Sequence, residues 1–444
     1  MKKLLFVLAL SIFCYGDTGL SLDEAIAKVK ANNQEIIIAK FEEQIKTLEH
    51  QAIVGQNYGS VDVVHNAVRT NDALSIFGMQ LQAREATFAD FGFKQFNGSN
   101  YMLAPQDLNN PKDRNAFQTK IEYTLPLYTG GKLEAYENIT KALHAMSQLD
   151  TEALLHEKIY ELKKSYFGLT LLQNHLYYLQ KIEANTAKLE ASMEAKLNEG
   201  YVKHVDVLEV KNKRADVARL IAQTKANEAL LYQYVSFLVD EPVSSIVGQY
   251  DSLSDELPLD GRWVDDTLAI KKAEQNKAIA QMNIKAQESA FLPQVSAFAN
   301  YGSSDDKWMN DFSKNDAYTA GIQVKLNLFN GGSDKSNLEK ARVQNLKASQ
   351  ELELAKKRLA LYVKQLQTHI QNDTNELESL KKEVELSRLI YENYSNRYEQ
   401  KLVSINEVLL KQSEELQKIM RLKEVQNARN EKILELQKIA AKEK

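Results

Sequence analysis

The chain has 444 residues, a hydrophobic content of 44% and a formal net charge of −4 at pH 7. This length suggests two or three domains, although an internal duplication would make one two-part domain equally reasonable. The slightly acidic balance excludes the basic field that favours nucleic acid as a partner.

The N-terminus is typical of an export signal. Two lysines precede an apolar run from Leu4 to Phe13, and small residues allow cleavage after Gly16, so residues 1–16 are predicted to be a signal peptide. A buried first helix is the alternative, but the run is short for one. The only cysteine, Cys14, lies in this segment, so the mature chain is expected to have no disulfide. Lipidation of Cys14 stays open, although a bulky phenylalanine precedes it.

The mature chain is expected to begin with a helix and two strands. A serine N-cap followed by acidic residues predicts a helix over 21–54. Alternating apolar and polar residues predict strands over 58–68 and, more clearly, over 117–125. Between them, residues 72–111 are expected to form a long loop with a short helix near 75–84.

Two very long tracts favour uninterrupted helices. Proline is absent from 127–241, and both glycine and proline are absent from 333–444. Inside a helix proline costs about 3 kcal/mol and glycine about 1 kcal/mol. We therefore predict helices over 133–199 and 335–400, each about 100 Å long at about 1.5 Å per residue. Heptad spacing in the second tract indicates helices packed along their lengths.

Each long helix is expected to fold back at a turn. The first turn, 199–201, contains a glycine suited to a helix C-terminus. The second, 400–402, has none, which leaves an unbroken helix through Lys401 as the alternative. Ser404 and Glu407 have the spacing of a capping box for the returning helix.

The second half is expected to repeat the first. A helix is predicted over 264–290, and strands over 295–302 and 318–328. Residues 241–263, which contain proline, serine and aspartate, are expected to form a linker or small equatorial segment.

Two landmarks show the duplication directly. The heptapeptide at 125–131 reappears at 326–332, and the nonapeptide at 200–208 reappears at 401–409, both displaced by 201 positions. Such self-similarity indicates a duplicated supersecondary unit. The predicted organisation is a first structural repeat at 17–240, the linker, and a second repeat at 264–444.

The expected fold class is mainly α with β: duplicated long α-helical hairpins plus four amphipathic strands per protomer. Four strands cannot close a barrel, and a membrane barrel must leave no free edge. Three copies would supply twelve strands, which is consistent with the even-numbered closed barrels of outer membranes, and the long helices would form a tube continuing below. The resemblance described below implies the full arrangement, a trimeric 12-stranded outer-membrane β-barrel with a periplasmic α-helical barrel.

The sequence contains no pattern of catalytic chemistry. The seven histidines include no pair at metal-binding spacing, and Gly131-Lys132 lacks the other residues of a phosphate loop. We find no nucleophile arrangement. No enzyme activity, cofactor or metal site is therefore predicted.

The order, spacing and duplication of these pieces resemble the outer-membrane factor family, of which TolC is the type member. The resemblance covers essentially the whole mature chain, and no single motif carries it. The matching pieces are Ser21–Ile26 at the mature start, Leu125–Gly131 where strand becomes helix, both turns, and a long first loop with Leu74–Asp90 and Asn109–Pro111.

The resemblance implies a homotrimer in outer-membrane lipid of a Gram-negative bacterium, extending into the periplasm. It implies a passive export duct of a tripartite efflux pump or type I secretion system, with a periplasmic adaptor and an inner-membrane transporter as partners. A periplasmic coiled-coil adaptor is the alternative. The exported substrate, the particular pump and the ion selectivity are not predicted.

The resemblance also implies roles for individual residues. Glu407 maps to an acidic ring at the channel aperture, and Asp206 and Tyr398 map to its closing tie. In a trimer, three Glu407 carboxylates would meet at one axis and would raise one another's pKa values. The alternative role for Glu407 is that of a plain capping-box residue. Asp206 could equally serve the helix dipole. The second ring acid falls on Leu410 and the arginine of the tie on Val403, which are departures from the family pattern.

Two further groups of residues complete the expected sites. The implied adaptor-docking tips are Gly200, Tyr201, Val202, Lys401, Leu402 and Val403. The implied strand-to-helix turns contain Pro126, Gly130, Gly131, Gly331 and Gly332.

Overall fold

The computed structural model describes residues 19–248, 250, 252–254, 263–308 and 312–440. The predicted signal peptide at 1–16, including Cys14, lies outside this part of the chain, as does most of 251–262. The described residues form two compact units: unit 1 within 1–43, 146–274 and 351–444, and unit 2 within 44–145 and 275–350. Each unit contains parts of both sequence repeats.

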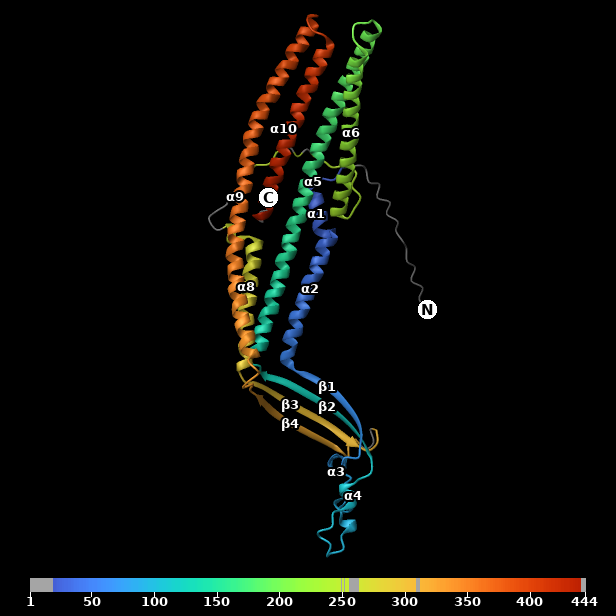
Figure 1. The fold of residues 1–444 in the computed structure, drawn as a ribbon, viewed down its shortest axis with the longest axis vertical. Helices are drawn as coiled ribbons and strands as arrows, with labels where there is room; N and C mark the ends of the chain where they lie inside the picture. The colour runs from blue at the N-terminus through green and yellow to red at the C-terminus, as the bar shows by residue number, and fades with distance from the viewer. Residues whose placement is uncertain (1–18, 249, 251, 255–262, 309–311, 441–444) are drawn as a thin grey trace, which may run out of the picture. The chain divides into compact units, whose positions relative to one another are not determined.

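Unit 1 contains two helical hairpins, whose turns lie at the same end of the unit (Figure 1). The first joins α5 (Lys132–Asn198) to α6 (His204–Val239), and the second joins α9 (Ser333–Glu399) to α10 (Ile405–Ile439). Both α5 and α9 have 67 residues, and α9 begins 201 positions after α5. The predicted long helices and their fold-back are confirmed, and the unbroken helix through Lys401 is wrong.

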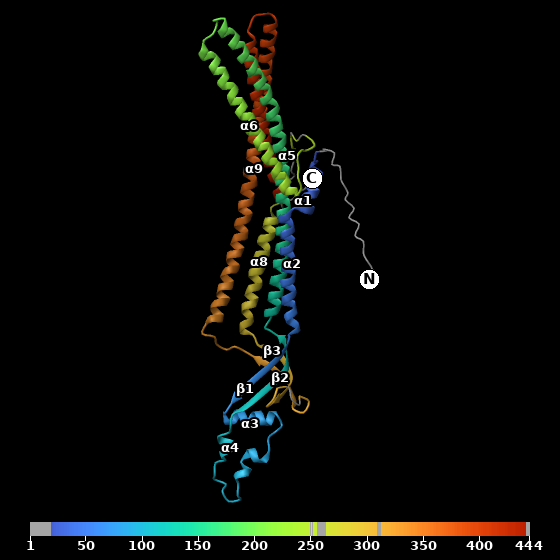
Figure 2. The ribbon, with the colours of Figure 1, turned by 90° about the vertical axis from the view of Figure 1, so that its right-hand side faces the viewer.

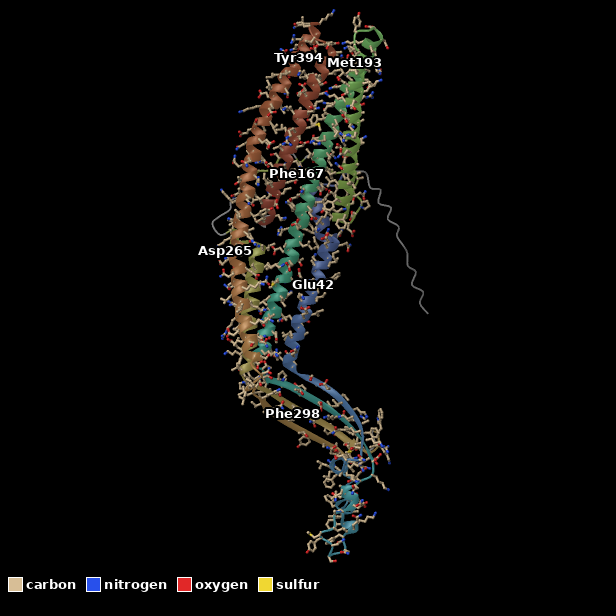
Figure 3. All side chains as sticks on the ribbon, in the orientation of Figure 1. Glu42, Phe167, Met193, Asp265, Phe298 and Tyr394 are labelled. Carbon is tan, nitrogen blue, oxygen red and sulfur yellow. The ribbon has the colours of Figure 1, made fainter. Side chains whose placement is uncertain are left out.

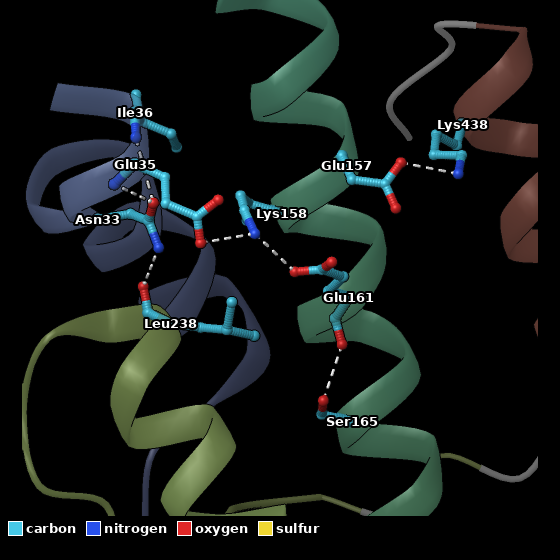
Figure 4. Close-up of polar contacts among 9 residues, drawn as sticks. All are labelled: Asn33, Glu35, Ile36, Glu157, Lys158, Glu161, Ser165, Leu238 and Lys438. Carbon is cyan, nitrogen blue, oxygen red and sulfur yellow. Dashed lines mark hydrogen bonds and ion pairs between the residues drawn. The ribbon is translucent and has the colours of Figure 1, made fainter. Parts of the chain in front are cut away.

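The opening helix is divided, contrary to the prediction of one helix over 21–54. It forms α1 (Leu22–Asn32) and α2 (Gln34–Gly55), separated by Asn33. The Asn33 side chain is buried, donates to the Leu238 carbonyl at 2.9 Å and accepts from the Ile36 N–H at 3.2 Å (Figure 4). Asn33 therefore ends one helix, caps the next, and fixes both to α6.

The helix expected over 264–290 is divided in the same way. Its parts are α7 (Trp263–Asp266) and α8 (Leu268–Glu288), followed by the short 3₁₀ segment η4 (Ser289–Phe291). The intervening Thr267 is buried, and its hydroxyl donates to the Val264 carbonyl at 2.8 Å. This local bond competes with helical pairing.

Three apolar clusters hold unit 1 together. One lies among α1, α5 and α6 and includes Val29, Leu162 and Leu238. A second joins α9 to α10, and a third joins α5, α6 and α10 through Ile182, Val217 and Leu416. The third cluster packs the two hairpins against each other, because it takes residues from both.

A buried ion-pair network also fixes α2 to α5 (Figure 4). The Lys158 ammonium lies 2.9 Å from a Glu35 carboxylate oxygen and 3.1 Å from one of Glu161. Burial acts to lower the pKa of Lys158, but the hydrogen bonds to both carboxylates outweigh it, so the pKa is raised. Lys158 therefore stays charged although it is buried, as expected for a paired cation.

Unit 2 contains one antiparallel sheet in the order β1-β2-β3-β4 (Figures 1 and 2). The strands are β1 (Ser60–Thr70), β2 (Arg114–Tyr128), β3 (Gln294–Asp305) and β4 (Asp316–Lys325). The four predicted strands are confirmed, although β4 ends at Lys325 rather than at residue 328.

The loop between β1 and β2 contains short helices. They are α3 (Ala73–Gln82) and α4 (Gln106–Asn109), with the 3₁₀ segments η2 (Phe88–Phe91) and η3 (Phe93–Gln95) between them; a further 3₁₀ segment, η1 (Gln56–Tyr58), precedes β1. The short helix predicted near 75–84 is confirmed as α3.

Candidate channel aperture and membrane-facing sheet

The first hairpin turn is closed by two backbone hydrogen bonds. The Tyr201 N–H donates to the Lys196 carbonyl at 2.8 Å, and the Gly200 N–H donates to the Leu197 carbonyl at 3.0 Å. Gly200 has a φ of 80°, in the left-handed region. This is the glycine-dependent helix C-terminus that the sequence predicts.

The second turn repeats this pattern without glycine. The Leu402 N–H donates to the Arg397 carbonyl and the Lys401 N–H to the Tyr398 carbonyl, both at 2.8 Å. Lys401 has a φ of 60°. A residue with a Cβ atom is strained there, so the duplicated fold, rather than the local sequence, sets this conformation.

Both turns expose apolar side chains. Tyr201 is 78% exposed and Leu402 is 63% exposed, whereas Val202 and Val403 are half-buried. Figure 3 labels Met193 and Tyr394 in the last turns of α5 and α9. The Asn406 amide of α10 donates to the Met193 sulfur of α5 at 3.4 Å, so the two hairpins are in contact close to their turns.

Glu407 closes a capping box at the start of α10, as its sequence spacing predicts. Its carboxylate accepts from the Ser404 N–H at 2.7 Å and from the Ser404 hydroxyl at 3.0 Å. These hydrogen bonds lower the pKa of Glu407, and the nearby charges of Arg397 and Lys196 lower it further. Within one chain this direction is opposite to the rise expected for three clustered carboxylates, because the turn itself stabilises the ionised form.

Asp206 occupies the equivalent position at the start of α6. Its carboxylate accepts from the Lys203 N–H at 2.9 Å. Among the hydrogen bonds of the described residues, none joins Asp206 to Tyr398, whose side chain is 43% exposed in the last turn of α9. Their role as a tie stays a prediction.

The strand-to-helix turns are built on paired glycines. Gly130 and Gly131 have φ values of 65° and 82°, and their counterparts Gly331 and Gly332 have 56° and 81°. A Cβ atom on Gly130 would lie 2.8 Å from the Ser289 carbonyl oxygen, so glycine is required there for space as well as for conformation.

Pro126 lies just before the first of these turns. The pairing register of β2 with β3 shifts between Pro126 and Tyr128. A bulge of this kind bends a strand and accommodates a proline, which cannot donate a ladder hydrogen bond.

The sheet has one apolar face, which the registers define. One cross-strand row contains Val63, Ile121, Tyr301 and Tyr318. The next row on this face contains Val61, Tyr123, Ala299 and Ala320. The row between them, on the opposite face, contains Asp62, Glu122, Asn300 and Thr319.

This apolar face is exposed in the single chain. Val63 is 73% exposed and Tyr318 is 82% exposed. An extended apolar face with a polar reverse side is the property expected of a sheet that contacts lipid or another apolar surface. The alternation in the sequence predicted two-faced strands, and the register shows that the faces match across all four.

A cluster of carboxylates was missed by sequence reasoning. Glu85, Asp305 and Asp306 place oxygen atoms within 4.8 Å of one another, although Glu85 is remote from the others in sequence. Burial, a hydrogen bond to Asp305 and the charge of Glu85 raise the pKa of Asp306. Arg114 forms an ion pair with Glu85 and so partly neutralises the cluster within the protein.

Among the described residues, no helix combines the length and the apolar character that crossing a bilayer requires. Residues 265–442 match the outer membrane efflux protein family. No curated protein matches the sequence.

Several solved structures share the fold. The CmeC outer membrane channel of Campylobacter jejuni is 13% identical, with a TM-score of 0.77 over 94% of this chain and 85% of that one. The outer membrane protein VceC of Vibrio cholerae is 14% identical, with a TM-score of 0.75 over 94% and 96%. The MtrE outer membrane channel of Neisseria gonorrhoeae, in an open state, is 14% identical, with a TM-score of 0.75 over 94% and 88%.

The described chain therefore shares the fold of these outer-membrane channels. The family match covers residues 265–442, which is less than half of the chain, and the likeness to the solved structures over the whole described chain is one of fold.

Proposed function

We propose that the protein is a passive export duct that works as a homotrimer in a tripartite efflux pump or type I secretion system. The observation that carries the proposal is the sheet of unit 2, which has an exposed apolar face and is joined to two duplicated helical hairpins. Lipid would cover the apolar face, and the polar reverse face would line water.

The strands at the edges of the sheet support the proposed trimer. In the described sheet, β1 pairs with β2 alone and β4 pairs with β3 alone. An unpaired edge cannot be left in a bilayer, because its N–H and C=O groups would lack partners. Pairing β4 of one copy with β1 of the next removes every edge, and three copies give a closed twelve-stranded barrel.

The hairpin turns would form the periplasmic end of the duct. There Glu407 would face the axis as a ring of three carboxylates, and Asp206 and Tyr398 would help to close the aperture. The exposed apolar side chains Tyr201 and Leu402 would dock a periplasmic adaptor, which would connect the duct to an inner-membrane transporter. Gly200, Val202, Lys401 and Val403 would shape the same tips.

The test uses the mature full-length chain purified in mild detergent. We expect a protein mass of three chains, a hollow cylinder in electron micrographs, and discrete conductance steps in planar bilayers. A monomer, or a trimer that never conducts, would contradict the duct. A trimer that conducts but binds no adaptor in a pull-down would retain the duct and reject the pump assembly.

A further inference from the structure

The loop between β1 and β2 forms an open pocket of about 320 Å³. Four aromatic rings line it, those of Phe91, Phe93, Phe96 and Tyr101. This volume lies at the lower end of the range of about 300–1,000 Å³ that is typical of small-molecule sites. The cavity lies wholly within unit 2 and is remote in sequence from the hairpin turns.

The walls of the cavity are held by neighbouring rings. Phe77 of α3 packs edge-on against Phe91, with ring centroids 5.1 Å apart and planes at 89°. Phe93 packs against Phe96 in the same manner, with centroids 6.3 Å apart. Such edge-to-face pairs favour one arrangement of the rings, so the cavity exists before a ligand enters.

Backbone contacts also preform the site. Gly92 has a φ of 88°, and a Cβ atom there would lie 2.6 Å from the Pro105 side chain. The Gln95 side-chain oxygen accepts from the Gln106 N–H at 2.7 Å, and the Asn100 amide donates to the Gln95 carbonyl at 2.8 Å. These bonds join the two sides of the loop, and a preformed site pays less ordering entropy on binding.

The chemistry of the lining selects the ligand. None of the described residues that line the cavity carries a charge. The side chains of Gln95 and Asn100 already make hydrogen bonds within the loop. A charged ligand would lose its hydration without gaining a counter-charge, whereas an aromatic ring can stack on four others.

We propose that this cavity, called here the loop pocket, binds an uncharged small molecule containing one or two aromatic rings. The lack of a cation argues against an anionic lipid headgroup. The proposal does not depend on the export function, because every contact that carries it lies within residues 77–106.

The test uses benzophenone, an uncharged two-ring photoreactive ketone, with the full-length protein in detergent. After irradiation, mass spectrometry locates the labelled peptides at increasing probe concentrations. We expect saturable labelling of residues 91–105 that naphthalene competes away. Tyr101→Ala should raise the probe concentration that gives half-maximal labelling about tenfold, because one stacking surface is lost.

Two further variants separate binding from loss of fold. Leu103→Trp, which fills the loop pocket with an indole, should abolish the labelling while the loop keeps its resistance to protease. Leu74→Ala, which changes an exposed apolar residue of α3 outside the pocket, should leave the labelling unchanged. Labelling that does not saturate, or that also spreads to α3, would overturn the proposal.

Two other occupants would also overturn it. One is a second copy of the chain, which would protect residues 91–105 from the label in the oligomer but not in the monomer. The other is a lipid acyl chain, which native mass spectrometry would detect on the wild type and not on Leu103→Trp.

Discussion

The carboxylates at the hairpin turns each have a structural partner within their own turn. Glu407 accepts from the Ser404 N–H and hydroxyl, and Asp206 accepts from the Lys203 N–H. The capping role predicted as the alternative for Glu407 is therefore present, and it does not conflict with a functional role. The hydrogen bonds from Ser404 fix the direction of the Glu407 carboxylate and lower its pKa, which favours its ionised form.

Glu407→Gln separates these two roles. Glutamine preserves a capping box but removes the charge, so the turn should persist while the preference of the channel for cations falls by roughly twofold or more. The measurement is the reversal potential in planar bilayers under a salt gradient. Glu378→Gln, an exposed charge elsewhere on α9, is the matched control.

The pH dependence of the wild type provides a second check on Glu407. Because hydrogen bonds from Ser404 lower the pKa of Glu407 below its ordinary value of 4.5, the charge is present above that value and is lost as the pH falls through the lowered pKa. Cation preference should therefore be unchanged between pH 7 and pH 5. A decline of cation preference within that range would mean that neighbouring carboxylates raise the pKa of Glu407. In the substitution experiment, an unchanged cation preference in Glu407→Gln would mean that Glu407 is not part of the ring.

At the scale of elements, the two turns have the same geometry from different sequences. The αL position is glycine in the first turn and lysine in the second, yet the hydrogen bonds match. The strain at Lys401 is about 1–2 kcal/mol by general experience with L-residues. The capping box at Ser404 and Glu407 and the packing of α10 offset it.

Exchanging the residue at this position should change the stability of the turns in opposite directions. Lys401→Gly should stabilise the second turn by about 1 kcal/mol, and Gly200→Ala should destabilise the first by a similar amount. Hydrogen exchange of the last turns of α9 and α5 measures these local stabilities. If Lys401→Gly and Gly200→Ala changed the local stability of their turns in the same direction, backbone strain would not be the difference between the two turns.

The contact between α5 and α10 contains a half-buried histidine. The His175 Nε2 atom lies 3.8 Å from a Glu424 carboxylate oxygen. Burial lowers the pKa of His175 below its ordinary value of 6.5, and the charge of Glu424 offsets this only in part. The unfolded chain therefore binds a proton more readily than the folded chain.

Stability should consequently fall as the pH drops from 6.5 to the lowered pKa of His175. The contribution of one such group is at most about 1.4 kcal/mol per pH unit. In His175→Gln the slope of unfolding free energy against pH over this range should be smaller, whereas the exposed His204→Gln should keep the wild-type slope. Urea titrations at a series of pH values make the comparison, and identical slopes for all three proteins would contradict it.

At the scale of the whole molecule, the two faces of the sheet support the proposed placement of the protein in lipid. Its two faces differ because the register aligns Val63, Ile121, Tyr301 and Tyr318 in one row. In water this face would be a liability, since large exposed apolar patches favour association. In lipid it contributes stability.

A matched pair of substitutions in β1 tests this assignment. Val63→Lys places a charge on the apolar face and should cost about 2–4 kcal/mol near the bilayer midplane. Asn66→Lys, on the opposite face of the same strand, should cost much less. Unfolding in lipid vesicles compares them. Equal costs would mean that the apolar face does not contact lipid.

The chain by itself determines the helices, the strands and the duplication. The absence of glycine and proline, the alternating strands and the displacement of 201 positions are local or repetitive signals, and the structure contains each element that they predict. The breaks at Asn33 and Thr267 were missed, because Asn33 acts through the Leu238 carbonyl, a partner remote in sequence.

Only the tertiary structure decides which residues meet. The aromatic loop pocket, the carboxylates of Glu85 and Asp305, and the contact of His175 with Glu424 each join segments whose spacing follows no sequence period. The conformation of Lys401 is decided in the same way, since packing between the hairpins outweighs the local preference of a lysine. Periodicity specifies the elements, whereas sites form by contacts that only the assembled chain brings together.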